Sequence, residues 1–312
     1  MRVVGFHQPG EPEVLEVIDL PDPSPSEGEV RIRVHAASVN PTDTSLRSGK
    51  SIGSSDEEPG VHVPGMDAAG VLEEIGDGVE TDLSVGDHVM AIVTPSGTHG
   101  AYSEHIVVPI ESVALAPRGF NHVQAATLPM NGLTARLALD TLALEAGSVL
   151  AVTGAAGTMG GYAIQLAKKD GLTVVADAKE DDEERVAGLG ADLVLRRGDE
   201  FPRLLQEQYP DGVNGVIDGA LMLEKIVPAV RDGGTIITVR GHDEPAERDI
   251  TFKPIWVADY SRAPGKLDAL RQHAEDGTVT LHVADTFPKD QAPEAHRRQE
   301  AGGVRGRLVL EF

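Results

Sequence analysis

The sequence contains no cysteine, few aromatic residues and a shortage of positive charge. Of its 312 residues 4% are aromatic, and 27 Lys and Arg stand against 50 Asp and Glu, which gives a formal net charge of −23. The absence of cysteine excludes disulfides, a thiol nucleophile and any zinc or iron–sulfur site built from thiolates. The acidic excess repels phosphates and anionic lipids over most of the surface. We therefore expect no nucleic-acid partner and no membrane partner.

Long hydrophobic runs are also missing. No stretch approaches the roughly 20 consecutive apolar residues that a membrane-spanning helix needs, and Met1 to Gly5 lack the apolar run of a secretory signal. With 40% apolar residues and 35 Gly, the composition is that of an ordinary globular protein. The length fits two compact domains. We expect a cytoplasmic protein.

The region from residue 1 to about 121 has the pattern of β-structure. Val30, Ile32 and Val34 alternate with charged residues, the period of two that is typical of a strand with one wet face. Short apolar runs separated by Gly, Pro and Asp predict a β-rich barrel or sandwich. These runs are Val3–Val4, Leu15–Ile18, Val30–Val34, Gly70–Leu72, His88–Val93 and Glu104–Val108.

After His122 the pattern changes to alternating strands and helices, which predicts an α/β domain with a doubly wound parallel sheet. The expected strands are Val149–Thr153, Thr173–Ala176, Leu193–Leu195, Gly215–Asp218, Thr235–Val239 and Ile250–Val257. The expected helices are Met159–Asp170, Asp182–Gly188, Phe201–Gln208 and Ala220–Arg231. Six strands are the number of a complete Rossmann sheet that binds a dinucleotide.

The last 50 residues predict helices at Gly265–Glu275 and Gln291–Ala301 and a closing strand at Gly306–Phe312. Because this segment returns to a mixture of β runs and turns, we expect it to pack on the first domain. The predicted domains are a substrate domain at 1–122, a dinucleotide-binding domain at 123–262 and a C-terminal segment at 263–312 that completes the first.

A strand, a glycine-rich turn and a helix follow one another directly between Leu150 and Lys168. Small residues let backbone N–H groups approach a pyrophosphate, Gly160 permits close packing of helix and strand, and the helix N-terminus supplies partial positive charge. The alternative is an ordinary tight turn, but Asp177 ends the next strand about 20 residues on, where it can accept hydrogen bonds from a ribose. The predicted cofactor contacts in the turn are Gly154, Ala155, Ala156, Gly157, Thr158, Met159 and Gly160.

The choice between NADPH and NADH stays open at this point. The carboxylate of Asp177 favours the free 2′-hydroxyl of NADH and repels a 2′-phosphate. Lys179 would attract that phosphate, unless it is simply a solvated lysine at a helix start. Ligands in such sheets lie across the carboxyl ends of the strands, where Asp218, Gly219 and Arg240 are expected.

Several ordered motifs carry a family resemblance. They are Ala37–Gly49 and Val63–Leu72, with the patterns Asn-Pro-x-Asp and Pro-Gly-x-Asp-x-x-Gly, then Ala125–Pro129, Leu133–Ala135, Gly154–Lys168, Leu189–Asp192, Val216–Asp218 and Gly303–Leu310. Over nearly its whole length the chain resembles the zinc-independent quinone oxidoreductases of the medium-chain dehydrogenase/reductase superfamily. The resemblance implies a GroES-like domain beside the Rossmann domain, a nicotinamide cofactor and a small-molecule quinone or enone substrate.

The resemblance also bears on metal binding. In the zinc-dependent branch a cysteine and a His-Glu pair hold the catalytic metal, whereas this chain has Asn40 and Met66-Asp67 at those positions. We therefore predict no metal site. Without a Lewis acid, quinones and α,β-unsaturated carbonyls are the fitting hydride acceptors, because the developing charge is delocalised.

By resemblance, the catalytic candidates are Asn40 and Asp43, in a cleft between the domains, and Thr134, near the nicotinamide. Asn40 can donate its amide N–H to the acceptor oxygen, or be only a turn residue before a proline. Asp43 can orient Arg47 four residues on, or form a plain helical salt bridge with it. No tyrosine, Tyr102 included, stands out as a proton donor, so we expect the proton to come from water.

Other assignments are less direct. By similarity, Asp218, Gly219 and Arg240 flank the cofactor. Arg240 could instead pair with Asp243 or Glu244, and Arg307 in the closing strand carries the same double interpretation.

Two other functions stay open, an enoyl-thioester reductase of the same superfamily and a nucleotide-binding sensor or structural protein. We expect a homodimer through the edge strand Thr251–Val257, unless Phe252 and Trp256 are core residues.

Overall fold

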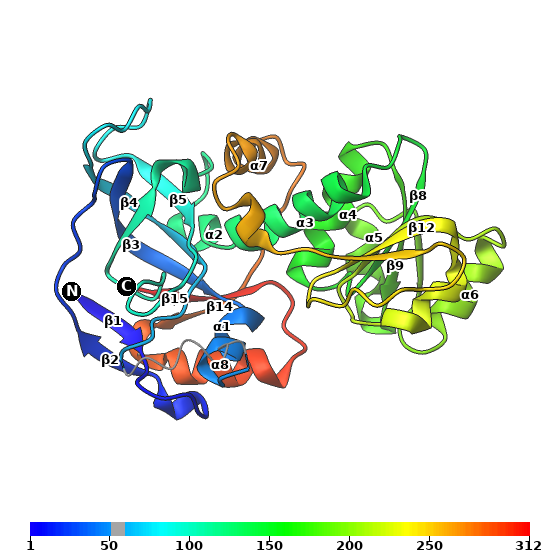
Figure 1. Cartoon of the computed structure of the whole chain (residues 1–312), viewed down its shortest axis with the longest axis horizontal. Helices are drawn as coiled ribbons and strands as arrows, with labels where there is room; N and C mark the ends of the chain where they lie inside the picture. Colours follow the sequence, from blue (N-terminus) through cyan, green and yellow to red (C-terminus); the bar gives the residue numbers. More distant parts are fainter. Residues whose placement is uncertain (51–59) are drawn as a thin grey trace. The chain divides into compact units, whose positions relative to one another are not determined.

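The computed structural model describes residues 1–50 and 60–312. The chain divides into two compact units (Figure 1). Unit 1 comprises Met1–Met130, Ser261–Asp276 and Leu281–Phe312, and unit 2 comprises Asn131–Tyr260 and Gly277–Thr280. Unit 1 therefore takes its residues from both ends of the chain. No helix among the described residues has the length and apolar character needed to cross a membrane.

Unit 1 is the β-rich part. β1 (Arg2–Gly5) and β2 (Glu16–Asp19) form an antiparallel pair. A larger sheet has the order β14-β15-β3-β4-β5-β7, with β6 also paired to β3. Its strands are β3 (Glu29–Val39), β4 (Asp67–Ile75), β5 (His88–Ile92), β6 (His105–Pro109), β7 (Val113–Leu115), β14 (Val283–Pro288) and β15 (Arg307–Glu311). The closing strand, β15, runs antiparallel to β3.

The core of unit 1 follows from the alternation in its strands. Val30, Ile32 and Val34 of β3 are at most 2% exposed, as their period of two predicts. Every predicted apolar run of this region lies in or overlaps a strand. The helices of unit 1 are α1 (Pro41–Arg47), α2 (His122–Ala125), α7 (Lys266–Glu275) and α8 (Ala292–Ala301).

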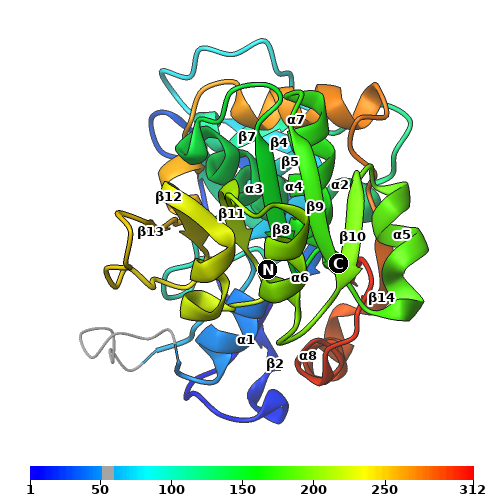
Figure 2. The ribbon, with the colours of Figure 1, turned by 90° about the vertical axis from the view of Figure 1, so that its right-hand side faces the viewer.

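Unit 2 is a Rossmann domain. Its six strands are all parallel and have the order β10-β9-β8-β11-β12-β13 (Figure 2). The strands are β8 (Val149–Thr153), β9 (Thr173–Ala178), β10 (Leu193–Arg196), β11 (Val213–Asp218), β12 (Val230–Thr238) and β13 (Thr251–Pro254). Counted from β8, this is the order 3-2-1-4-5-6 of a dinucleotide-binding sheet. The predicted fold class is confirmed.

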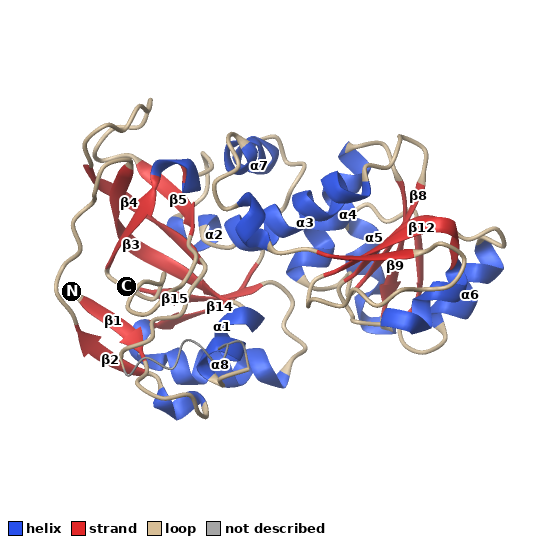
Figure 3. Cartoon of the chain, in the orientation of Figure 1, coloured by secondary structure: helices blue, strands red, loops and turns tan. Residues whose placement is uncertain are grey.

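Helices lie on either side of the strands of unit 2 (Figure 3). They are α4 (Thr158–Lys169), α5 (Glu183–Gly188) and α6 (Phe201–Gln208), and α3 (Pro129–Leu142) leads into the unit. The predicted helix Ala220–Arg231 is wrong: the segment holds a 3-10 helix at Leu223–Ala229, and β12 already begins at Val230. Pro228 lies inside that 3-10 helix and cannot donate a backbone hydrogen bond.

Candidate functional site

The glycine-rich turn after β8 has the geometry of a phosphate turn. Gly154 adopts φ +70°, a left-handed conformation that favours glycine. A Cβ on Gly160 would lie 2.5 Å from the carbonyl oxygen of Gly154 and 2.8 Å from Cα of Ala155, so only glycine permits this approach of helix and turn. Gly157 is the N-cap of α4 and makes no side-chain cap. The first N–H groups of any helix have no intrahelical acceptor, and here no N-cap side chain accepts a hydrogen bond from them either.

Thr158 supplies a further sign of a ligand at this turn. Its Oγ1 is buried and has no hydrogen-bond partner among the described residues. A buried hydroxyl without a partner is unusual in a folded protein, and a ligand that accepts a hydrogen bond explains it. Ala155 and Ala156 are buried, and Met159 is half-buried. The turn therefore fits the pyrophosphate of a dinucleotide.

Asp177 lies beneath the turn. The residue is 2% exposed, and its Oδ1 accepts a hydrogen bond of 3.0 Å from the N–H of Ala155. Its Oδ2 is 3.6 Å from Nε of Arg197, which follows β10. Burial raises the pKa of this carboxyl. Lys179, the other residue considered for cofactor choice, is exposed at the start of a short 3-10 helix.

The residues after β11 and β12 differ from one another. Asp218 is fully buried and accepts hydrogen bonds from Thr153 Oγ1 and from two backbone N–H groups. Gly219 lies against the turn, because a Cβ on it would be 2.7 Å from the carbonyl oxygen of Thr153. Arg240 is exposed and has no ion pair with any described residue. The alternative pairing of Arg240 with Asp243 or Glu244 is therefore not formed.

A second constellation, which we call the buried polar network, lies in unit 1. Asn40 is fully buried and caps α1: its N–H donates to Asp43 Oδ2 over 2.7 Å, and its amide donates to Asp67 Oδ2 over 2.7 Å. The guanidinium of Arg307 donates to Asn40 Oδ1 and to the carbonyl oxygen of Val39. Asn40 thus joins two carboxyl groups and one cation.

Burial sets the electrostatics of this network. It raises the pKa of Asp43 to about 7 and that of Asp67 to about 6, with the Arg307 charge opposing the rise in both. The two carboxyls also repel each other, because the charge of Asp67 raises the pKa of Asp43. The network therefore gains or loses protons close to neutral pH.

Two further members of the network, Tyr102 and His296, were missed by sequence reasoning. The Tyr102 hydroxyl donates to Asp43 Oδ2 over 3.3 Å and lies 3.2 Å from Nε2 of His296. Both residues are fully buried, at 0% exposure. Burial lowers the pKa of His296 to about 3. No local motif marks either residue, because the contact depends on the tertiary fold.

The expected link between Asp43 and Arg47 is wrong. The carboxylate of Asp43 accepts the N–H groups of Asn40 and Gly65, whereas Arg47 pairs with Glu300 of α8. A capping carboxylate at the first turn of α1 points toward the helix N-terminus and so away from Arg47. Thr134, the third catalytic candidate, lies on α3 in unit 2 and is 9% exposed.

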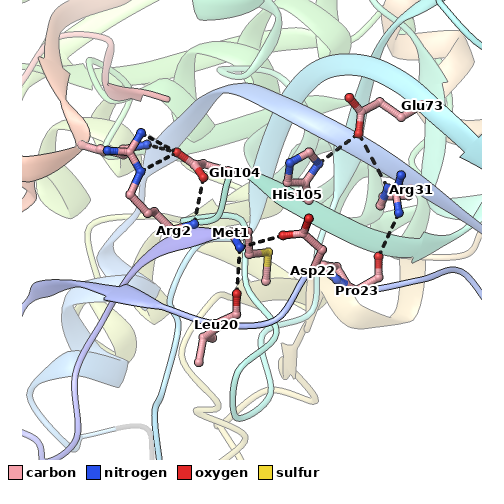
Figure 4. Close-up of polar contacts among 10 residues, drawn as sticks. Met1, Arg2, Leu20, Asp22, Pro23, Arg31, Glu73, Glu104 and His105 are labelled. Atoms are coloured by element: carbon pink, nitrogen blue, oxygen red, sulfur yellow. Dashed lines mark hydrogen bonds and ion pairs between the residues drawn. The ribbon is translucent and has the colours of Figure 1, made fainter.

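One cavity of unit 1 contains none of the predicted site residues. It has a volume of about 320 Å³, and its lining includes Leu20, His99 and His105. Figure 4 shows polar contacts beside it: His105 Nδ1 lies 3.0 Å from Glu73, and Arg2 Nε donates to Glu104 over 2.9 Å. The first contact joins β6 to β4, and the second joins β1 to the residue before β6. Both contacts therefore stabilise the structure of unit 1.

Comparison with known proteins decides the family. A model of the alcohol dehydrogenase GroES-like domain matches residues 26–118, and a model of a zinc-binding dehydrogenase matches residues 189–310. A chloroplastic NADPH-dependent alkenal/one oxidoreductase of Arabidopsis thaliana is 34% identical over 297 residues, which cover 92% of this chain and 73% of the relative. The chain belongs to the medium-chain dehydrogenase/reductase superfamily.

Other members of the superfamily are similar over the full length. A quinone oxidoreductase of Sus scrofa is 29% identical over 328 residues, with 99% of this chain and 96% of the relative covered. The solved structure of a quinone oxidoreductase from Coxiella burnetii has a TM-score of 0.86 at 27% identity and covers 100% of this chain and 99% of its own.

The residues of this chain do not suit the metal named in the second matched model. Asn40 and Met66-Asp67 offer an amide, a thioether and one carboxylate, a poor donor set for zinc. Both ends of the Asn40 amide are hydrogen-bonded, and the Arg307 guanidinium beside it opposes a second cation. Over residues 1–50 and 60–312, no three His, Asp or Glu side chains are placed to hold a metal ion.

Proposed function

We propose that this member of the superfamily transfers hydride from NAD(P)H to a quinone or to an α,β-unsaturated carbonyl. The observation that carries the proposal is the combination of a phosphate turn in unit 2 with an Arg–Asn–Asp network in place of a zinc donor set in unit 1. The names of the relatives support it, since they include an alkenal/one oxidoreductase and quinone oxidoreductases.

The residues have distinct proposed tasks. A bound nicotinamide supplies the hydride. The Thr158 hydroxyl and the N–H groups of Ala156 and of Thr158 to Gly160 hold the pyrophosphate, aided by the partial positive charge of the α4 N-terminus. Asn40 and Thr134 are the proposed contacts of the acceptor and the nicotinamide. The hydrogen bonds of Asp43 make it a positioning residue, because it fixes the backbone of Asn40. The proton comes from water.

The deciding experiment is an assay of the purified protein with NADPH and NADH, a small quinone and a small enone, with EDTA present throughout. We expect saturable binding of the cofactor and turnover that EDTA leaves unchanged. Binding without turnover of either acceptor would refute the reductase proposal and favour a sensing role. Cytoplasmic location and the absence of a nucleic-acid partner stay predictions from composition and charge.

We also propose NADPH as the preferred cofactor. The Oδ1 of Asp177 is bonded to the turn and its Oδ2 lies 3.6 Å from Nε of Arg197, so the guanidinium offsets part of the negative charge that would repel a 2′-phosphate. Arg197, whose side chain is 40% exposed, and Lys179 offer positive charge at the ends of neighbouring strands. A guanidinium can bind a phosphate with two hydrogen bonds. A relative named as NADPH-dependent supports the same choice.

Arg197→Ala is expected to raise the Kd for NADPH about tenfold, which is the loss of one charge-assisted contact. The Kd for NADH should change by less than about twofold, because NADH lacks the phosphate. The control is Arg196→Ala, which removes the neighbouring exposed arginine at the end of β10. Fluorescence titration gives all the constants, and an equal loss for both cofactors would contradict the assignment.

The edge strand supports a homodimer, which we propose as the assembly. Within the described residues β13 pairs only with β12, and Trp256 just beyond it is 57% exposed. Phe252, at 5% exposure, is therefore a core residue, as the alternative interpretation predicted, whereas Trp256 is not. We expect a dimer mass in light scattering at micromolar concentration and a monomer mass for Trp256→Ala, because exposed tryptophans often anchor interfaces. A monomer mass for the wild type would refute the proposal.

A further inference from the structure

A short loop of unit 2 combines backbone strain with an exposed apolar side chain. After β11, residues 219–223 carry Leu221 and Leu223 at φ values of 58° and 52°. Residues with a Cβ rarely adopt this left-handed conformation, and it persists only where the surroundings hold it. Leu221 is also 37% exposed. The fold therefore holds this loop in a strained conformation, and the loop places the Leu221 side chain at the surface.

Two buried side chains, Asp218 and Thr153, hold this loop. Asp218 Oδ1 accepts hydrogen bonds from Thr153 Oγ1 over 2.6 Å and from the N–H of Met222 over 3.0 Å, and its Oδ2 accepts the N–H of Leu223 over 2.8 Å. Thr153 Oγ1 in turn accepts the N–H of Ala220 over 3.0 Å. Both side chains are fully buried, so water does not compete for these bonds. The loop is thereby fixed to the last residue of β8.

The same loop lies directly against the phosphate turn. A Cβ on Gly154 would be 3.0 Å from the carbonyl carbon of Gly219, and a Cβ on Gly219 would be 3.0 Å from Cε of Met159. Nothing larger than glycine fits at either contact without a shift. A ligand held by the turn therefore has the 219–223 loop as an immediate neighbour.

We propose that Asp218 and Thr153 are positioning residues, which keep the 219–223 loop in its strained form so that Leu221 makes an apolar contact with the bound nicotinamide cofactor. The inference rests on the proposed function, because it takes NAD(P)H as the ligand. It also changes the role of Asp218 from the contact expected from the sequence. Both of its carboxylate oxygens accept hydrogen bonds from the protein, so its effect on the cofactor is indirect.

Leu221→Gly tests the contact, because glycine adopts the left-handed conformation without strain. We expect the melting temperature to rise by about 2 °C, while the Kd for NADPH rises about tenfold through loss of the apolar contact. A higher melting temperature with an unchanged Kd would overturn the proposal, since it would leave the loop a purely structural role. The control is Ala143→Gly, which relieves a φ of 47° at an exposed position after α3 and should leave the Kd unchanged.

Thr153→Val tests the positioning role, because it removes the hydroxyl and nearly preserves the volume. We expect the Kd for NADPH to rise about tenfold and the amide hydrogens of Met222 and Leu223 to exchange faster. Thr127→Val removes a buried hydroxyl in unit 1 and should lower stability without changing the Kd. If the wild type binds NADPH and both test variants bind it equally well, this inference fails alone. If the wild type binds neither NADPH nor NADH, the proposed function fails with it.

Discussion

Gly160→Ala is expected to weaken cofactor binding strongly, with a rise of at least about 100-fold in the Kd for NADPH. The added Cβ would lie 2.5 Å from the carbonyl oxygen of Gly154 and 2.8 Å from Cα of Ala155. Both are backbone atoms, so relief requires α4 and the phosphate turn to separate. A displacement of about 1 Å in a site of this kind can cost a factor of about 100. Overpacking should also lower the free energy of unfolding by about 1–3 kcal/mol.

Gly161→Ala is the matched control for this prediction. It adds the same methyl group one residue later on the same helix, where the nearest atom is Cδ1 of Leu189 at 3.3 Å, the mobile end of a side chain. Alanine also favours a helix over glycine by about 1 kcal/mol. We expect wild-type affinity and equal or higher stability. Similar losses in both variants, measured by titration and by thermal melting, would show that the close approach at Gly160 is not what shapes the turn.

The sequence predicts the strand, glycine-rich turn and helix of β8 and α4 well because the signals for them are local. Gly154 and Gly160 are required by backbone geometry within one strand–turn–helix unit, and the helix Phe201–Gln208 is confirmed at both ends. The alternation of strands and helices also suffices to predict the parallel sheet. In each case the residues that decide the structure are close together in the chain.

The buried polar network was only partly predictable because its contacts join distant segments. Asn40 and Asp43 follow from a motif, but Tyr102 meets Asp43 across 59 residues and His296 across 194. The failure at Ala220–Arg231 has a similar cause. Asp218 accepts the N–H groups of Met222 and Leu223, which a continuous helix would have oriented differently. Side chains that capture the backbone in this way override helix propensity.

Arg307→Leu is expected to destabilise unit 1 strongly, and more so at high pH. At pH 8 we expect a loss of about 3–5 kcal/mol in the free energy of unfolding, the usual result of removing one partner of a buried ion pair. The ionised carboxylates of Asp43 and Asp67 would then be left without their cation. Near pH 5 both carboxyls are largely protonated, so the loss should fall to about 1–2 kcal/mol, the value of the lost hydrogen bonds.

The sign of this pH dependence follows from the two raised pKa values. The pKa of Asp43, about 7, and that of Asp67, about 6, exceed the ordinary value of 3.8, so these groups favour the native state most at low pH and lose that contribution as pH rises toward 7. Removing the guanidinium raises both pKa values further, so stability falls more steeply as the pH rises. His296, whose pKa burial lowers, has the opposite slope, but it is present in both proteins and largely cancels in their difference.

Urea unfolding of wild type and Arg307→Leu at pH 5 and pH 8 measures this difference. Arg118→Leu is the control, because the Arg118 side chain is 87% exposed where it pairs with Glu275, and such a pair contributes at most about 1 kcal/mol. A loss for Arg307→Leu that is equal at the two pH values would contradict the role assigned to the two carboxyls. Unchanged stability with weaker NADPH binding would instead make Arg307 a cofactor ligand. A difference between wild type and Arg307→Leu that grows from pH 5 to pH 8, with no such growth for Arg118→Leu, is the result expected of an arginine that compensates the two buried carboxylates.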